Sequence, residues 1–349
     1  MSLTIYLPHL LLVLPLGLVS ALAVRAMIRW PILDVPNARS SHVVVTPRGG
    51  GVGPVLAFIL GMIGLFQMAD FARIADRQFI GVILAAVAIG TVGLIDDVRD
   101  LSARLRLTCQ VTAAAVALAS GLTLTHISLP GAGMIDLGAM GALVTLFWIV
   151  GCTNAVNFMD GLDGLVGGTV LIACTALAAI AATQGGGFVY AAALFLAVGF
   201  AGFLPFNLHP ARIFMGDVGA QFAGFMLAVL AVAAAQFDSN QVSFLIVPLL
   251  LFGLLFDAGF TLARRALMRH RLGEGHRTHL YQMAQRSGMA VGRVAAAHWG
   301  FALFHSGLAV VFLTLSPADK PLVVLPALAV QIGWAAYVMR RMRRAGLGW

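Results

Sequence analysis

The chain contains a polar cluster between two long apolar segments, from Asn154 to Leu165, with the sequence Asn-Ala-Val-Asn-Phe-Met-Asp-Gly-Leu-Asp-Gly-Leu. Four polar residues recur at every third position, Asn154, Asn157, Asp160 and Asp163, so neighbouring members share one face of a helix. A carboxylate at the centre of a bilayer costs about 2.5–3.5 kcal/mol on insertion scales, and such residues usually serve a site. Carboxylate and amide oxygens suit a hard cation such as Mg2+ and the hydroxyls of a sugar or nucleotide. The cluster therefore indicates a binding or catalytic site rather than the polar cap of a helix end.

Two further groups of carboxylates lie at the ends of apolar segments. Asp96, Asp97 and Asp100 crowd one short stretch, Ile-Asp-Asp-Val-Arg-Asp. Like charges repel unless a cation or a basic partner neutralises them, so this group favours a divalent metal. Alternatively, Asp100 could pair with Arg104 on the same helix. Asp217 lies between two glycines at the start of another apolar segment, where it is either a site residue or a helix N-cap.

Two basic segments could bind phosphate. The glycine-rich loop 34–53 contains Arg48, and its glycines could bring backbone N–H groups close to an anion, but it lacks the Gly-Lys-Ser/Thr ending of a Walker loop. The segment 263–294 contains Arg277 and His279 among many arginines. Two histidines three residues apart, His276 and His279, could bind a metal, but the segment has no Cys to complete a tetrahedral set with them. With arginines around them, phosphate binding is the better interpretation of this segment, whereas the signal of the loop 34–53 is weak taken alone.

Composition assigns the chain to the integral membrane proteins. Hydrophobic residues make up 60% of it, charged residues only 10%, and the mean hydropathy is +0.95. A soluble domain carries about 25% charged residues. We predict an all-α, polytopic membrane protein in which residues 1–349 form a single domain. Asp257, inside an apolar segment, either pairs with an arginine or lines the site.

Eleven apolar segments are close to the roughly 20 residues that a membrane-spanning helix needs. They are about 5–24, 50–69, 78–95, 107–125, 138–156, 165–183, 188–206, 218–236, 242–262, 295–315 and 321–339. Of the 22 basic residues, nineteen fall in the segments after the odd-numbered spans and three on the opposite side. Because cytoplasmic loops carry the excess of Lys and Arg, this count predicts an external N-terminus and a cytoplasmic C-terminus.

In their order along the chain, these motifs resemble those of the polyprenyl-phosphate N-acetylhexosamine-1-phosphate transferases. The matching motifs are Asp-Asp-x-x-Asp at 96–100, Asn-x-x-Asn-x-x-Asp-Gly-x-Asp-Gly at 154–164, Phe-Met-Gly-Asp at 214–217 and a Thr-Pro-Arg-x-Gly-Gly-like stretch at 46–51. A cytoplasmic loop with histidines extends the resemblance, which covers about residues 34–282. It implies ten or eleven spans in the bacterial inner membrane and a cytoplasmic active site. It also implies a requirement for Mg2+, with Mn2+ as an alternative ion.

The resemblance also implies the reaction and its partners. A UDP-N-acetylhexosamine reacts with undecaprenyl or another polyprenyl phosphate, a membrane lipid, to give sugar-diphosphate-polyprenol and UMP. The reaction joins two anions, so the site must neutralise charge and hold the reacting groups in line. A homodimer is compatible with this interpretation, and nucleic acid is not expected as a partner.

The resemblance implies roles for the residues that match the family's motifs. Catalytic roles fall on Asp96, Asp97, Asp160 and Asp217, of which Asp160 and Asp217 are the expected metal or diphosphate residues, and Asp96 or Asp97 would orient or deprotonate the lipid phosphate. The expected substrate-binding residues are Asn154, Asn157, Gly161, Leu162, Asp163, Asn207, Arg48, Arg277 and His279. Among these, the stretch from Gly161 to Asp163 resembles the part that contacts uracil.

The sequence departs from the family in one loop. Tyr281 and Gln282 stand where the O-antigen-type enzymes often carry a second pair of histidines. The peptidoglycan enzyme has a triple-His stretch and a basic residue in place of Asp100, and both are missing here. The peptidoglycan role is therefore the alternative, and the form of the loop resembles the subgroup that initiates O-antigen with 6-deoxy N-acetylated sugars. A secondary transporter is the alternative from another class, but transporter sites lie near the bilayer midplane and often show repeats.

The distribution of basic residues predicts the topology. We expect a reporter fused after Trp349 to be cytoplasmic and one inserted in the loop 126–137 to be external, because nineteen basic residues mark the cytoplasmic side. Paired phosphatase and fluorescent-protein fusions measure both positions. A reversed result would separate the acidic motifs from cytoplasmic UDP-sugar and would contradict the enzyme interpretation.

Overall fold

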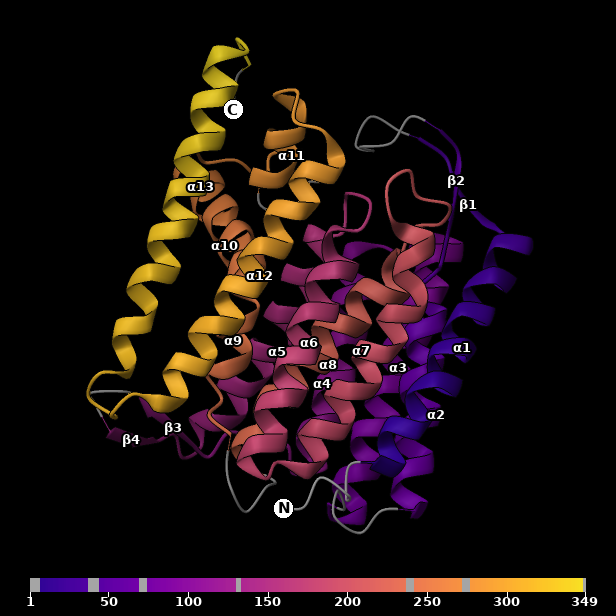
Figure 1. The fold of residues 1–349 in the computed structure, drawn as a ribbon, viewed down its shortest axis with the longest axis vertical. Helices are drawn as coiled ribbons and strands as arrows, with labels where there is room; N and C mark the ends of the chain where they lie inside the picture. Colours follow the sequence, from indigo (N-terminus) through magenta and orange to yellow (C-terminus); the bar gives the residue numbers. More distant parts are fainter. Residues whose placement is uncertain are drawn as a thin grey trace.

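The computed structural model describes residues 7–36, 44–68, 74–129, 133–236, 242–271 and 277–347 (Figure 1). Long helices run side by side as a bundle. They are α1 (Leu7–Arg29), α2 (Val52–Met68), α3 (Asp76–Arg99), α4 (Ala103–Ala119), α5 (Met140–Met159), α6 (Leu165–Gln184), α7 (Gly187–Asn207), α8 (Gly216–Gln236), α12 (Val291–Thr314) and α13 (Val324–Arg344). Shorter helices are α9 (Ile246–Leu250), α10 (Phe252–Leu267), α11 (Leu280–Arg286) and a 3-10 turn at Lys320–Val323.

Each of the eleven predicted apolar segments contains at least one helix. Within the described part of the chain, eight helices are long and apolar enough to cross a membrane, which supports a polytopic membrane protein. The others are shorter: α2 and α4 have 17 residues each, and the predicted ninth span is divided at Leu251 into α9 and α10. The number eleven and the orientation therefore stay predictions.

Two small hairpins differ from the purely helical prediction. β1 (Ile32–Asp34) pairs antiparallel with β2 (Thr46–Arg48), and β3 (His126–Leu129) pairs with β4 (Gly133–Asp136). In Figure 1, β1 and β2 lie at the same end of the bundle as the C-terminal end of α13, and β3 and β4 lie at the opposite end. Segments too short to form a helix satisfy their backbone hydrogen bonds by pairing with each other. The first hairpin matters for the site because it places Arg48.

α8 forms the centre of the bundle. All its residues from Val218 to Ala234 are buried, and the helix contacts α2, α3, α5 and α7. A helix that is apolar on all sides lies either in lipid or among other helices, and here other helices surround it. The polar residues at its N-terminus are consequently held in place by the neighbouring helices.

Glycines bring two backbones against the start of α8. A Cβ added at Gly93 of α3 would lie 2.6 Å from Val218 Cα and 2.7 Å from the Asp217 carbonyl oxygen, and one added at Gly51 would overlap Gly219. Small residues at such crossings allow membrane helices to approach closely. The close approach of α3 to α8 brings Asp97 to the start of α8.

The contact at Gly93 gives a prediction about stability. Gly93→Ala should lower the unfolding temperature of the detergent-solubilised protein, because its methyl group meets backbone atoms that cannot rotate away, and overpacking costs about 1–3 kcal/mol. Gly151→Ala is the matched control, since a Cβ at this mid-helix glycine of α5 has nothing within 4 Å. Thermal denaturation followed by tryptophan fluorescence compares the two. Equal unfolding temperatures for both variants would contradict the proposed close packing.

Candidate active site

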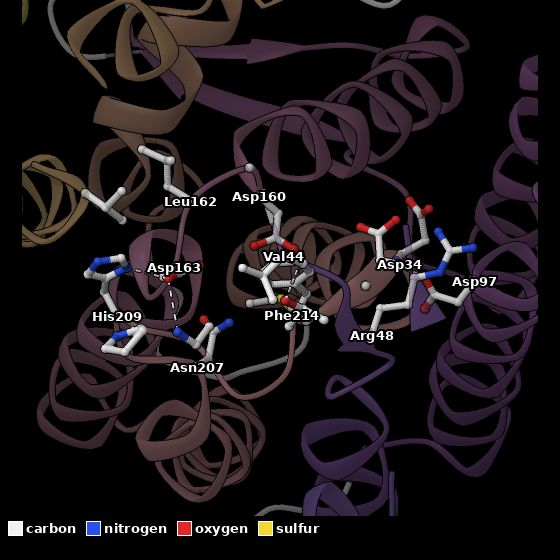
Figure 2. Close-up of a pocket in the computed structure, with 18 of the residues that line it drawn as sticks. Asp34, Val44, Arg48, Asp97, Asp160, Leu162, Asp163, Asn207, His209 and Phe214 are labelled. Atoms are coloured by element: carbon white, nitrogen blue, oxygen red, sulfur yellow. Dashed lines mark hydrogen bonds and ion pairs between the residues drawn. The ribbon is translucent and has the colours of Figure 1, made fainter. Parts of the chain in front are cut away.

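A cavity of about 630 Å³ lies at the end of the bundle that carries β1 and β2 (Figure 2). Nine of the thirteen predicted site residues line it: Arg48, Asp97, Asn157, Asp160, Gly161, Leu162, Asp163, Asn207 and Asp217. They come from β2, α3, α5 with the loop after it, α7 and the start of α8. The structure thus brings together motifs that are far apart in the sequence.

Asp97 caps the N-terminus of α8 from another helix. Its Oδ1 accepts a hydrogen bond from the backbone N–H of Asp217 at 2.9 Å, and its Oδ2 accepts one from that of Val218 at 3.1 Å. The first N–H groups of a helix have no partner within the helix and carry a partial positive charge, so a carboxylate suits them. Gly216 has a φ of 75° and a Cβ there would overlap the Asp97 carboxylate, so a glycine is required. The N-cap role weighed for Asp217 therefore belongs to Asp97.

Asp217 has one carboxylate oxygen engaged by side chains. Its Oδ1 accepts hydrogen bonds from Asn157 Nδ2 at 2.6 Å and from Gln221 Nε2 at 3.1 Å. Both donors are neutral amides, so they orient the carboxylate without neutralising its charge. No hydrogen bond reaches Oδ2 from the described residues, so Asp217 can offer that oxygen to a ligand in the cavity.

Asp160 follows the last residue of α5 and lies partly buried in the cavity wall. Burial, together with the negative charges of Asp217, Asp97 and Asp163, raises the pKa of Asp160 to about 8. Crowded carboxylates of this kind are stabilised by a cation.

These carboxylates fit a magnesium ion that the substrate helps to bind. Among the residues that the structure describes, no three His, Cys, Asp or Glu side chains are grouped closely enough to hold a metal by themselves. Mg2+ is usually bound by one or two carboxylates together with substrate phosphates, and it prefers oxygen ligands. Asp160 and Oδ2 of Asp217 provide such a pair, since the oxygens of Asp97 are engaged by α8.

Arg48 brings a positive charge to the same cavity. Its Nη2 donates to Asp100 Oδ1 at 3.1 Å, and its Nε lies 4.0 Å from Asp97 Oδ1. Burial alone would lower the pKa of Arg48, but the hydrogen bond to Asp100 and the charges of Asp97, Asp100 and Asp34 raise it above its usual value. Asp100 pairs with Arg48 rather than Arg104 because α3 ends at Arg99.

Backbone hydrogen bonds hold Arg48 near the start of α8. Phe214 N–H donates to the Pro47 carbonyl at 2.8 Å, and Gly50 N–H donates to the Phe214 carbonyl at 2.9 Å. The β1–β2 hairpin is thereby joined to the segment that leads into α8. Phe214 also lines the cavity, as Arg48 does.

Two predicted substrate-binding residues hold the loops of the cavity together. Asn207 Oδ1 accepts from the Gly164 N–H at 3.0 Å, and its Nδ2 donates to the Ile213 carbonyl at 3.0 Å. Asp163 Oδ2 lies 2.7 Å from His209 Nδ1 and accepts from the Ala211 N–H at 3.1 Å. Figure 2 shows the Asp163 contact as a dashed line. Both side chains therefore join the loop after α5 to the loop after α7.

Four predicted residues do not line the cavity. Asp96 accepts from the Leu101 N–H at 2.7 Å and from Arg106 Nη1 at 3.2 Å, so it joins the end of α3 to α4. Asn154 donates to Gln110 of α4. The roles assigned to these two residues stay predictions, but each already has a partner within the protein.

The other two, Arg277 and His279, lie in the segment that leads into α11. His279 Nδ1 lies 3.2 Å from Asp257 Oδ1. The same aspartate accepts from the N–H groups of Leu280 at 2.8 Å and Tyr281 at 3.0 Å, and so caps α11. Neither alternative considered for Asp257 matches the described residues, among which it forms no ion pair with an arginine and does not line the cavity.

α11 contributes residues that the sequence analysis did not identify as site residues. Gln282 and Gln285 line the cavity, as do His209 and Phe214. Tyr281 is buried and donates from its hydroxyl to the Phe158 carbonyl at 3.1 Å, and a Cβ at Gly161 would overlap that hydroxyl. Polar residues in a loop after a membrane span gave too weak a signal to single out these glutamines.

Comparison with known proteins gives the family of the chain. Residues 79–235 match glycosyl transferase family 4. The chain is 32% identical over 326 residues to the decaprenyl-phosphate N-acetylglucosaminephosphotransferase of Mycobacterium tuberculosis, covering 84% of this chain and 79% of that protein. It is 28% identical over 277 residues to the probable undecaprenyl-phosphate N-acetylglucosaminyl 1-phosphate transferase of Bacillus subtilis, covering 78% and 75%.

A third relative represents the peptidoglycan branch. The phospho-N-acetylmuramoyl-pentapeptide-transferase of Geobacillus kaustophilus is 36% identical over 200 residues, covering 54% of this chain and 60% of that protein. The long matches to the first two relatives confirm the resemblance seen in the motifs. The chain belongs to the polyprenyl-phosphate N-acetylhexosamine-1-phosphate transferases of glycosyl transferase family 4.

Proposed function

We propose that this protein transfers an N-acetylhexosamine-1-phosphate from a UDP-sugar to undecaprenyl phosphate and releases UMP. The observation that carries the proposal is the cavity in which Asp160 and Asp217 face the same space as Arg48. Carboxylates for a divalent cation and a guanidinium for phosphate are the groups that a reaction between two phosphorylated substrates needs. The names of the relatives support a polyprenyl phosphate acceptor.

In the proposed reaction an oxygen of the lipid phosphate attacks the β-phosphorus of the UDP-sugar. A bond forms between that oxygen and the β-phosphorus, and the bond from the β-phosphorus to the bridging oxygen breaks, so UMP leaves with the bridging oxygen. When bound, Mg2+ supplies charge neutralisation at the diphosphate. Asp160 and Asp217 would hold it, and Arg48 would bind a phosphate oxygen.

Asp97 and Asp217 have different contacts in the structure, and we propose different roles for them. Asp97 and Asp217 come from separate motifs, and one caps the helix on which the other lies. We propose that Asp97 acts on the lipid phosphate through Arg48, whose Nε lies 4.0 Å from its Oδ1, since both Asp97 oxygens accept from α8 and a phosphate monoester with a second pKa near 6 needs positioning more than a strong base. The loop from Gly161 to Asp163 and Phe214 would contact the nucleoside.

We propose that the protein lies in the bacterial inner membrane with this cavity on the cytoplasmic face, where it would start O-antigen or related cell-envelope polysaccharide synthesis. The count of basic residues supports that orientation. The peptidoglycan reaction is the second candidate, because one group of relatives carries that name. The choice of donor sugar distinguishes the two.

Release of UMP tests the proposal. Purified protein in detergent with undecaprenyl phosphate and Mg2+ should release UMP from a UDP-N-acetylhexosamine, whereas UDP-N-acetylmuramoyl-pentapeptide should be inactive. Chelation should abolish release and added Mg2+ should restore it, because Asp160 and Asp217 offer hard oxygen ligands in the cavity. Full turnover in metal-free buffer would remove the role given to Asp160 and Asp217.

Asp217→Asn isolates the charge at the proposed metal position. It should lower turnover at least about 100-fold, in line with loss of a main electrostatic contributor, while the fold is kept because the side chain has the same shape. Asp136→Asn, on the exposed hairpin at the other end of the bundle, is the matched control and should leave turnover unchanged. Similar rates for Asp217→Asn and wild type would contradict the proposed centre.

A further inference from the structure

A chain of three amide side chains, two of them buried, crosses the bundle to Asp217. Asn154 Nδ2 donates to Gln110 Oε1 at 2.7 Å, Gln110 Nε2 donates to Gln221 Oε1 at 3.0 Å, and Gln221 Nε2 donates to Asp217 Oδ1 at 3.1 Å. We call Asn154, Gln110 and Gln221 the amide relay. Its members lie on α5, α4 and α8, so the relay ties three helices to one carboxylate.

The hydrogen bonds of the amide relay all run from donor to acceptor in one direction, from Asn154 to Asp217. Asn154 Nδ2 also donates to the Val150 carbonyl at 2.8 Å, and a carbonyl oxygen can only accept, so the nitrogen of Asn154 is fixed at that end. The carboxylate of Asp217 accepts at the other end. Each amide therefore turns its N–H towards the next member, and hydrogen bonds in such a series polarise one another.

The burial of the relay argues for a function. Gln110 is 2% exposed and Gln221 is fully buried. A buried amide costs free energy unless it is hydrogen-bonded, and polar residues within membrane spans are rare outside functional sites. Neither glutamine lines the cavity, so neither is placed to touch a substrate there.

We propose that the amide relay positions Asp217 for the divalent cation. Donors from Gln221 and Asn157 hold Oδ1, which leaves Oδ2 for the ion. If the relay is broken at Gln110, Gln221 loses the donor that holds its oxygen, so its side chain is no longer fixed in the one orientation that donates to Asp217 Oδ1. Gln110 and Gln221 are thus positioning residues. This inference rests on the proposed function, because the ion is the one proposed for Asp160 and Asp217.

The test breaks the relay at its middle member. Gln110→Met keeps an unbranched side chain of similar length but cannot donate or accept as an amide does. Binding of Mn2+, used in place of Mg2+, is measured by electron paramagnetic resonance titration with a UDP-N-acetylhexosamine present and the lipid phosphate left out, because the diphosphate is expected to complete the ion's ligands. We expect binding about 10-fold weaker than in wild type, the lower end of the effect of losing a partner of a metal ligand, because Gln110 acts on Asp217 through Gln221. The Mg2+ concentration that half-saturates UMP release should rise by a similar factor.

Gln331→Met is the matched control. Gln331 on α13 is also a buried glutamine in a membrane helix, 1% exposed, and its Nε2 has no hydrogen-bond partner in the described structure. It has no link to Asp217, so Mn2+ binding should stay as in wild type. An equal loss in both variants would overturn the proposal, because it would reflect general loosening of the bundle.

Gln110→Leu is the second variant, and it also serves if Gln110→Met does not fold. Its side chain neither accepts from Asn154 nor donates to Gln221, so Mn2+ binding should again weaken. Wild-type Mn2+ affinity in either folded variant would overturn the proposal. Wild-type protein that binds Mn2+ in a Gln110-dependent way but releases no UMP would instead contradict the proposed function and leave the positioning role supported.

Discussion

The hydrogen bonds between the Asp97 carboxylate and the first N–H groups of α8 are the contact on which the site depends. A helix N-terminus stabilises a negative charge, so α8 can keep this carboxylate buried near other carboxylates. The contact in turn fixes the first turn of α8, where Asp217 lies. It requires glycines at 216 and 93, because side chains there would push α3 away from α8. The residues that allow α3 and α8 to pack closely are therefore also the residues that position the carboxylates of the site.

Inside the bundle, polar residues are tolerated because they are paired. Membrane helices gain little from burying apolar surface, since lipid is apolar too, and rely on close packing and interhelical hydrogen bonds. α8 uses both close packing and hydrogen bonds. Its many alanines and glycines allow other helices to approach it, and Gln221 takes part in the amide relay to α4 and α5. The same bonds that hold the helices together therefore orient the carboxylate at the cavity.

The helix α11 shows how the C-terminal part of the chain reaches the site. Seven residues are too few for a stable isolated helix. Asp257 of α10 caps its N-terminus, and Arg341 of α13 donates to the carbonyl of Ser287 just after its last residue, at 3.0 Å. Negative charge at the start and positive charge at the end complement the helix dipole. α10 and α13 thereby hold Gln282 and Gln285 in the cavity wall, outside the region 79–235 that matches the family.

Composition, apolar length and motif spacing are local properties of the chain, so they predict the class of protein, the helical segments and the family. The motifs also predict nine of the residues that line the cavity. The partners of these residues, in contrast, depend on the folded structure: Asp97 meets a backbone 120 residues away, Asp100 pairs with Arg48, and Asp257 caps α11. The folded structure also places Asp96 and Asn154 outside the cavity wall, and it connects Gln110 and Gln221 to Asp217 by hydrogen bonds. Hydrogen bonds depend on distance and direction in space, and spacing along one helix cannot specify which other helix supplies the second group.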